Sequence, residues 1–193
     1  MDQNTENTLS ILSPDPNIHR LAQRMQAKKK ALFQYIRGLP VQQYSQAPSP
    51  GSWSVAQAAN HLYLSEKLSL AYLRKKMAYP EMIPPYHVKS WLSVALVKLV
   101  LKTNYKVKAP KTIDMWQSQE VYDVNELEVK WDELRSELFT YINESYPDFK
   151  NMLVFNHPFA GRLTMRQMLI FMVEHIDHHT RQIRRIARSL PPS

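Results

Sequence analysis

The chain contains no cysteine, which excludes disulfide bonds, thiolate metal ligands and cysteine nucleophiles. A transition metal bound by this protein would therefore need nitrogen and oxygen ligands, chiefly from histidine and carboxylate side chains. Glycine is also scarce, with 3 residues in 193, so few positions suit tight hairpins or a glycine-rich phosphate loop. The remaining composition is rich in helix-forming residues and predicts a single all-α domain.

Long apolar runs are missing as well. The longest, residues 91–101, is interrupted by Ser93 and Lys98 and is much shorter than the roughly 20 residues of a membrane-spanning helix. The N-terminus is polar and acidic, unlike a secretory signal, which begins with basic residues followed by an apolar stretch. We therefore expect a cytoplasmic protein with no membrane partner, in which residues 1–16 form a flexible leader and residues 17–193 form the helical domain.

Positive charge exceeds negative charge, which gives a formal net charge of +8. The basic residues are scattered along the chain and no nucleic-acid recognition motif accompanies them, so we do not expect a nucleic-acid partner. Residues 28–30 are three lysines, which we interpret as a solvated helix face. The arginines between residues 181 and 188 complement a helix dipole, an interpretation that competes with anion binding.

Apolar residues at spacings of three and four, together with capping patterns, predict four long helices. The first covers roughly residues 18–37, with Asn17 as its N-cap and Gly38 at its end. The second covers residues 54–78, and its opening serine forms a capping box with Gln57.

The third helix begins after Asp123, and the fourth covers residues 164–189, where the opening threonine forms a second capping box with Gln167. Residues 79–122 make a long connection with a short helical piece at residues 91–103. Such a length suits a crossover to the other end of a bundle, which would make the second and third long helices parallel.

Two histidines interrupt the apolar face of the last predicted helix. Four residues rotate an α-helix by about 400°, so the rings of His175 and His179 can converge on one ion at distances of about 2.0–2.1 Å. His61 lies on the expected inward face of the second helix and offers a third imidazole. Three histidine ligands leave a coordination position open, as in metal sites that act on water or on a substrate.

Simpler interpretations compete with this one, because a buried histidine is more often a hydrogen-bonded core residue than a ligand. His178 points about 100° away from His179 and is placed at the helix flank. His157 is either a pocket residue or an ordinary polar loop residue. Glu66 either accepts an imidazole N–H behind the ligands or faces solvent. Three bulky side chains are interpreted as core and not as a substrate pocket: Trp131, Phe171 and Met172.

Short motifs follow one another along the chain: Trp53-Ser54-Val55, Asn60-His61-Leu62, His157-Pro158, Gly161, Leu163-Thr164 and the closing Glu174-His175-Ile176-Asp177-His178-His179-Thr180-Arg181-Gln182-Ile183. Together they resemble the DinB/YfiT-like metalloprotein superfamily. The resemblance covers about residues 18–188, and the closing histidine motif is its most specific part.

This resemblance implies a four-helix bundle with up-down-down-up connectivity, often dimeric, that binds nickel or zinc. The implied ligands are His61 of the second helix and His175 and His179 of the last. It further implies a small-molecule substrate and a metal-dependent hydrolase or thiol S-transferase, the latter using a low-molecular-weight thiol such as bacillithiol or mycothiol. The alternative is a non-catalytic metal-binding interaction module, in which the ion only joins two helices.

Overall fold

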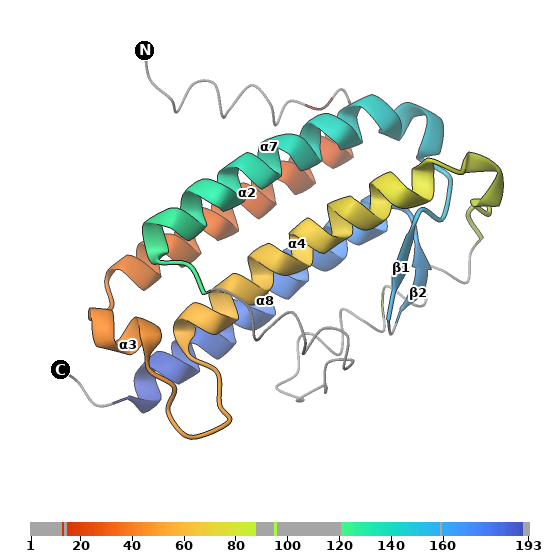
Figure 1. The fold of residues 1–193 in the computed structure, drawn as a ribbon. Coiled ribbons are helices and arrows are strands. Elements are labelled where there is room, and N and C mark those ends of the chain that lie inside the picture. Colours follow the sequence, from red (N-terminus) through yellow and green to blue (C-terminus); the bar gives the residue numbers. More distant parts are fainter. Residues whose placement is uncertain (1–12, 14, 88–94, 96–120, 159, 191–193) are drawn as a thin grey trace, which may run out of the picture.

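The computed structural model describes residues 13, 15–87, 95, 121–158 and 160–190. Four long helices dominate it: α2 (Pro16–Arg37), α4 (Val55–Met77), α7 (Val124–Phe149) and α8 (Met165–Ser189). Between them lie three small elements, namely the helix α3 (Val41–Ser45), the 3₁₀ turn η1 (Pro80–Met82) and the paired strands β1 (Phe155–His157) and β2 (Gly161–Leu163). The predicted four-helix bundle is confirmed (Figure 1).

The four long helices follow the up-down-down-up order. In Figure 1, α2 and α8 run in one direction while α4 and α7 run in the other, so the second and third long helices are parallel. Helices α2 and α4 each pack against both α7 and α8. Residues 88–94 and 96–120 lie outside the described part of the chain, and with them the short helix predicted at residues 91–103. No described helix has the length and apolar character needed to cross a bilayer.

The interior of the bundle is built from the apolar stripes that the sequence predicts. Trp131 of α7 is fully buried, and its ring meets that of Phe33 of α2 edge to face at a centroid distance of 5.9 Å. Met172 of α8 is also buried, whereas Phe171 is only half-buried. Each large apolar side chain removed from water contributes about 1.5–3 kcal/mol, so these stripes hold the four helices together.

Capping patterns set the beginnings of the helices that carry the histidines. Ser54 Oγ accepts from the Gln57 amide at 3.1 Å, and Gln57 Oε1 accepts from the Ser54 amide at 2.9 Å. Thr164 and Gln167 form the same pair of bonds at the start of α8, at 3.2 and 2.9 Å. Both predicted capping boxes are therefore confirmed, and each satisfies two backbone donors that the helix leaves unpaired.

The beginning of α2 differs from the prediction. Its N-cap is Asp15 and not Asn17, and the Asp15 carboxylate accepts from the amides of Asn17 and Ile18 at 2.8 and 3.1 Å. The physical reason is Pro16, which has no N–H and a φ angle already suited to the first helical position. Helix α2 thus begins two residues earlier than its apolar stripe suggests.

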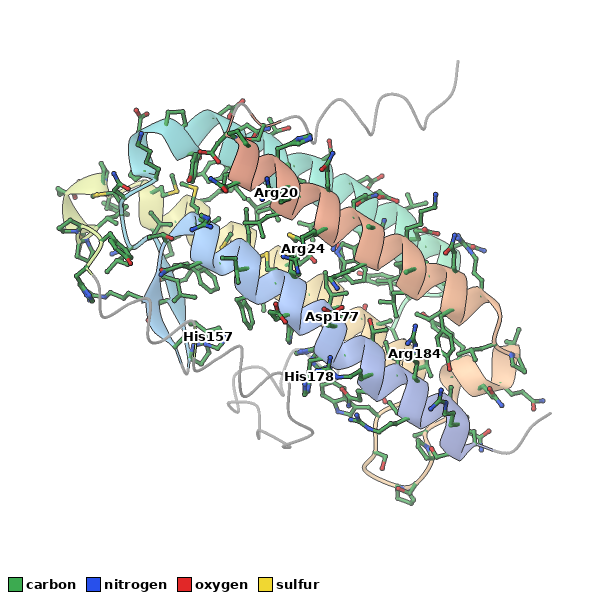
Figure 2. The ribbon with its side chains drawn as sticks, turned by 180° about the vertical axis from the view of Figure 1, so that it is seen from behind. Arg20, Arg24, His157, Asp177, His178 and Arg184 are labelled. Atoms are coloured by element: carbon green, nitrogen blue, oxygen red, sulfur yellow. The ribbon has the colours of Figure 1, made fainter. Side chains whose placement is uncertain are left out.

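The interpretation of the lysine run at residues 28–30 as a solvated face is wrong for Lys29, whereas Lys28 remains partly exposed. Lys29 is 1% exposed and its ammonium group lies 2.5 Å from a carboxylate oxygen of Asp132 on α7. Lys28 binds both carboxylate oxygens of Asp177 on α8, and Figure 2 shows Asp177 on the side of α8 that faces α2. Because α2 lies between α7 and α8, two neighbouring positions of the run point towards carboxylates.

A short hairpin precedes α8 where the sequence predicted an ordinary loop. Strands β1 and β2 are antiparallel, with His157 opposite Gly161 and Phe155 opposite Leu163. Gly161 has a φ angle of +67°, a conformation that favours glycine. The hairpin packs against α4 and α8, and the ring of His157 on β1 lies 4.3 Å from that of Phe171 on α8.

Candidate metal centre

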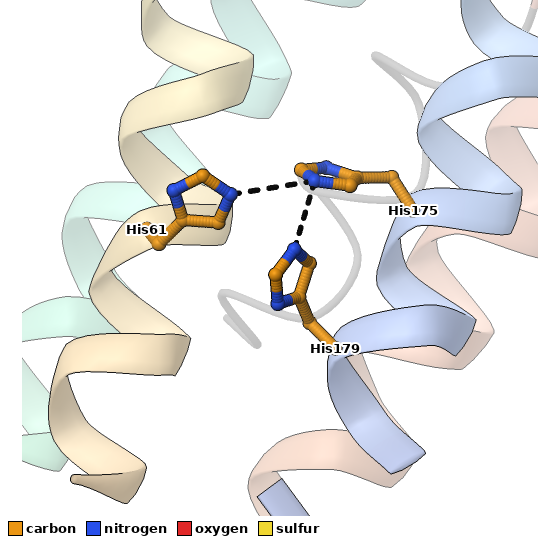
Figure 3. A group of neighbouring side chains, drawn as sticks. All are labelled: His61, His175 and His179. Atoms are coloured by element: carbon orange, nitrogen blue, oxygen red, sulfur yellow. Dashed lines mark hydrogen bonds between the residues drawn. The ribbon is translucent and has the colours of Figure 1, made fainter. Parts of the chain in front are cut away.

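Three imidazole rings meet between α4 and α8 (Figure 3). The Nε2 atom of His175 lies 3.3 Å from Nε2 of His61 and 3.0 Å from Nε2 of His179. One nitrogen from each ring lies within 4.8 Å of the other two. The structure therefore brings together the three residues that the sequence singled out, although 114 positions separate His61 from His175.

Helix geometry explains this convergence. His175 and His179 are one turn apart on α8, and α8 packs along α4, where His61 lies two turns after the Ser54 cap. His179 is buried, while His61 and His175 are half-buried. The cluster thus sits at the edge of the core, where a small molecule can approach it.

The arrangement of nitrogen atoms fits a cation better than a hydrogen-bond network. A neutral imidazole nitrogen carries either one proton or one lone pair, so Nε2 of His175 can form a hydrogen bond with only one of its two neighbours. A tetrahedral ion with Zn–N distances near 2.05 Å would place its ligand nitrogens about 3.3 Å apart. The observed separations of 3.0 and 3.3 Å are close to this value.

Gln182 determines which nitrogen of His179 can serve as a ligand. Its side-chain oxygen lies 2.7 Å from Nδ1 of His179 and can only accept a hydrogen bond there, so Nδ1 carries the donating proton. A proton on Nδ1 leaves the lone pair on Nε2, the atom that faces the cluster. Gln182 is one turn further along α8, so the same helix supplies His179 and the residue that orients its ring.

Burial keeps the cluster uncharged. Desolvation, helped by the charge of His178, lowers the pKa of His61 to about 4. Desolvation is also the main reason why the pKa values of His175 and His179 lie well below the ordinary value, with the neighbouring histidines as the second cause. All three rings are therefore neutral at pH 7, the form in which imidazole binds a metal.

Two aromatic rings flank the cluster. The ring of Trp53 is nearly parallel to that of His179, with a centroid distance of 6.1 Å, and lies 5.2 Å from the ring of His61. Phe171 stacks on His175 from the other side at 5.1 Å. Sequence reasoning gave Trp53 no role at the cluster, although Trp53 directly precedes the Ser54 cap of the helix that carries His61. The interpretation of Phe171 as core was incomplete, because its half-buried ring also borders the cluster.

A small cavity adjoins the cluster between α4 and α8. Its interior has room for about one water molecule, and it is lined in part by His175, Phe171 and Ser65. The hydroxyl of Ser65 lies 3.5 Å from Nε2 of His61. The cavity therefore borders the cluster at His175 and Ser65.

Both alternatives for Glu66 are wrong. Its side chain is buried, so it does not face solvent, and its hydrogen bonds come from α7 and not from an imidazole. Oε2 accepts from Trp131 Nε1 at 2.8 Å and from Arg135 Nε at 3.0 Å, while Oε1 accepts from Arg135 at 2.8 Å. The reason is the packing of α7 against α4, which places an arginine and an indole opposite this carboxylate.

Two further histidines, His157 and His178, are not part of the group of three (Figure 2). His157 is buried on strand β1, where its Nδ1 accepts from the Ala160 amide at 3.0 Å and its ring meets Phe171 at 4.3 Å. Desolvation lowers its pKa to about 4. It is thus part of the hairpin packing that supports Phe171. His178 is half-buried with its ring 5.1 Å from that of His179, in agreement with its predicted place at the flank.

Comparison with known proteins supports the assignment of the fold. A family model described as the DinB superfamily matches residues 24–183. Among solved structures, the chain resembles that of YfiT from Bacillus subtilis, described as a probable metal-dependent hydrolase with an unusual four-helix bundle topology. The sequences are 19% identical, the likeness covers 92% of this chain and 89% of that chain, and the TM-score is 0.55. At this identity the likeness concerns the fold. No curated protein matches the chain.

Proposed function

The chain belongs to the DinB superfamily, and from this premise we propose that it is a metal-dependent enzyme acting on a small molecule. In this proposal His61, His175 and His179 hold one divalent ion, zinc or nickel. The observation that carries the proposal is the convergence of three Nε2 atoms, with separations of 3.3 and 3.0 Å.

Each residue of the site has a definite task. When bound, a divalent ion lowers the pKa of a water molecule or a thiol and so supplies a nucleophile at neutral pH. The three histidines remain neutral and present lone pairs, and Gln182 keeps the proton of His179 on Nδ1. Trp53 and Phe171 cover two sides of the cluster.

We propose hydrolysis or thiol transfer as the reaction. Hydrolysis draws support from the description of YfiT as a probable metal-dependent hydrolase. Transfer to an electrophilic carbon would use a low-molecular-weight thiol as second cofactor, and both reactions need the same activated nucleophile. We further propose a cytoplasmic homodimer, for which light scattering of the purified protein is the direct test.

Metal analysis of histidine variants tests the ligand set. Protein purified without chelator or histidine tag should contain about one divalent ion per chain by elemental analysis. His175→Ala and His179→Ala should each lose most of it, because two imidazoles hold an ion far more weakly than three.

His178→Ala is the matched control, since this neighbouring histidine lies outside the cluster, and it should keep the wild-type metal content. Full occupancy in the His175 and His179 variants would remove these residues from the ligand set and overturn the proposal.

A non-catalytic role is the second candidate, and one observation favours it. The cluster joins α4 to α8, so a bound ion would tie two helices together whether or not it acts on a substrate. A rise in Tm on metal addition, combined with no turnover of activated esters and no thiol transfer to electrophiles, would identify this role.

A further inference from the structure

One ring nitrogen of His175 has no hydrogen-bond partner in the described part of the chain. Both contacts of this ring with the other two imidazoles are made by Nε2, so Nδ1 stays outside the cluster (Figure 3). An imidazole that binds a metal through Nε2 carries its proton on Nδ1, and almost always donates it to a carboxylate, a carbonyl or a water molecule. Gln182 accepts this proton from His179, but no described residue does the same for His175.

The cavity beside the cluster offers His175 an acceptor. Its polar lining consists of His175, Glu66, Ser65 and Ser69, while the other residues that line it are apolar. The interior has room for about one water molecule, which needs two or more polar partners to be held there. No histidine nitrogen of the described residues is both sealed from solvent and without a partner, so Nδ1 of His175 touches space that water can enter.

Glu66 keeps an acceptor position for such a water molecule. An ionised carboxylate offers about four lone-pair positions, and this one accepts three hydrogen bonds, one from Trp131 and two from Arg135. Two of the three bonds are made to Oε2, so Oε1 retains a lone pair. The hydroxyl of Ser69 donates to the carbonyl of Ser65 at 2.7 Å and can still accept a hydrogen bond. The cavity thus offers a water molecule several polar partners.

We propose that the cavity holds a single ordered water molecule, which accepts a hydrogen bond from Nδ1 of His175 and donates one to the carboxylate of Glu66. The inference deepens the proposed function and rests on it, because a proton on Nδ1 presupposes that Nε2 binds the ion. Glu66 is then a positioning residue, which acts on His175 through one water molecule as Gln182 acts directly on His179.

This assignment gives the buried pair of Glu66 and Arg135 a role beyond packing. A buried ion pair seldom stabilises a fold more than apolar residues of the same shape would. Here Arg135 and Trp131 of α7 fix the carboxylate on α4, and the fixed carboxylate orients the water that faces His175 on α8. An anionic acceptor behind the imidazole also makes it a more basic ligand.

A crystal structure of the zinc-loaded wild-type protein tests the water site directly. We expect one ordered water within about 3.2 Å of both Nδ1 of His175 and an oxygen of Glu66. Zinc at the cluster without this water, or with a water that contacts only one of the two groups, would overturn the inference and leave the proposed function intact. Elemental analysis of the same protein reports failure of the proposed function separately, as absence of metal.

Zinc affinity, measured in competition with a chelator, tests the positioning role. Glu66→Met combined with Arg135→Met removes the acceptor without leaving a charge unpaired, and should weaken zinc binding by about 10–100-fold. Arg74→Met combined with Glu137→Met removes the exposed ion pair between the same two helices and should keep the wild-type affinity.

Ser69→Val tests the same water from the other side of the cavity. Its additional methyl group occupies the place of the water while Glu66 and Arg135 remain, so zinc binding should weaken by a similar factor. Combining it with the Glu66 and Arg135 replacements should cause no further loss, because both changes act through one water molecule. Losses that add up, or an unchanged affinity in either variant, would overturn the positioning role. The wild-type crystal structure decides the water site even if a variant does not fold.

Discussion

At the scale of single residues, the histidine cluster depends on groups that are not themselves ligands. Gln182 fixes the proton of His179, while Trp53 and Phe171 restrict the rings of His179 and His175 by stacking on them. Such neighbours matter because a ligand that is free to rotate, or that carries its proton on the wrong nitrogen, must be reoriented before it can bind.

Replacement of Gln182 measures this effect. In Gln182→Leu, Nδ1 of His179 loses its acceptor, and the affinity for zinc should fall by about 10–100-fold in competition with a chelator of known affinity. Gln182→Glu keeps an oxygen at this position and should bind zinc at least as tightly as the wild type. Equal affinities in all three proteins would show that the hydrogen bond at 2.7 Å does not orient the ligand.

At the scale of helices, two arginine–glutamate pairs connect α4 to α7 in different surroundings. Glu66 and Arg135 are both buried, whereas the side chains of Arg74 and Glu137 are 48% and 49% exposed. The buried pair satisfies its charges with five hydrogen bonds that involve Trp131, Met25 and Gln26 besides the pair itself. The exposed pair competes with water and with salt.

These two pairs give a matched test of burial. Arg135→Met leaves the Glu66 carboxylate buried without its counter-ion and should lower the free energy of unfolding by about 3–5 kcal/mol. Arg74→Met removes an arginine from the same interface and should cost less than about 1 kcal/mol. Urea unfolding followed by circular dichroism gives both values. Similar losses of unfolding free energy in the two variants would mean that burial does not determine how much the pair of Glu66 and Arg135 contributes to stability.

Local signals explain why the helices could be predicted and several side-chain partners could not. The capping boxes at Ser54 and Thr164 and the apolar stripes depend on residues within one or two turns, so they can be read from the chain itself. The burial of Lys29 and the partners of Glu66 depend on which faces of α2, α4 and α7 meet. The three-residue strands β1 and β2 are too short for a periodic pattern.

At the scale of the whole molecule, the buried histidines connect protonation to folding. The pKa values of His61 and His157 are about 4 in the folded protein, and those of His175 and His179 are also lowered, chiefly by desolvation. In the unfolded chain histidine titrates near 6.5. Between these pH values the unfolded state binds more protons than the folded state.

We therefore expect the metal-free protein to be most stable above about pH 6.5 and to lose stability as the pH falls from there towards 4. Urea unfolding of chelator-treated protein at pH 7 and pH 5 measures the loss, in a range where most carboxylates remain ionised. A variant with His61→Gln, His175→Gln and His179→Gln should lose less over the same interval. An equal loss in both proteins would assign the pH dependence to other groups.

The positions of the three proposed ligands along the chain have a consequence for the unfolded protein. Two of them are four residues apart on α8, so a divalent ion can be captured by this segment before the chain has any tertiary structure. An ion that also binds the unfolded chain stabilises the native state less than its affinity for the native state alone suggests. The additional stabilisation of the native state depends on His61. Bringing His61 to the other two histidines closes a loop of more than a hundred residues, because 114 positions separate it from His175.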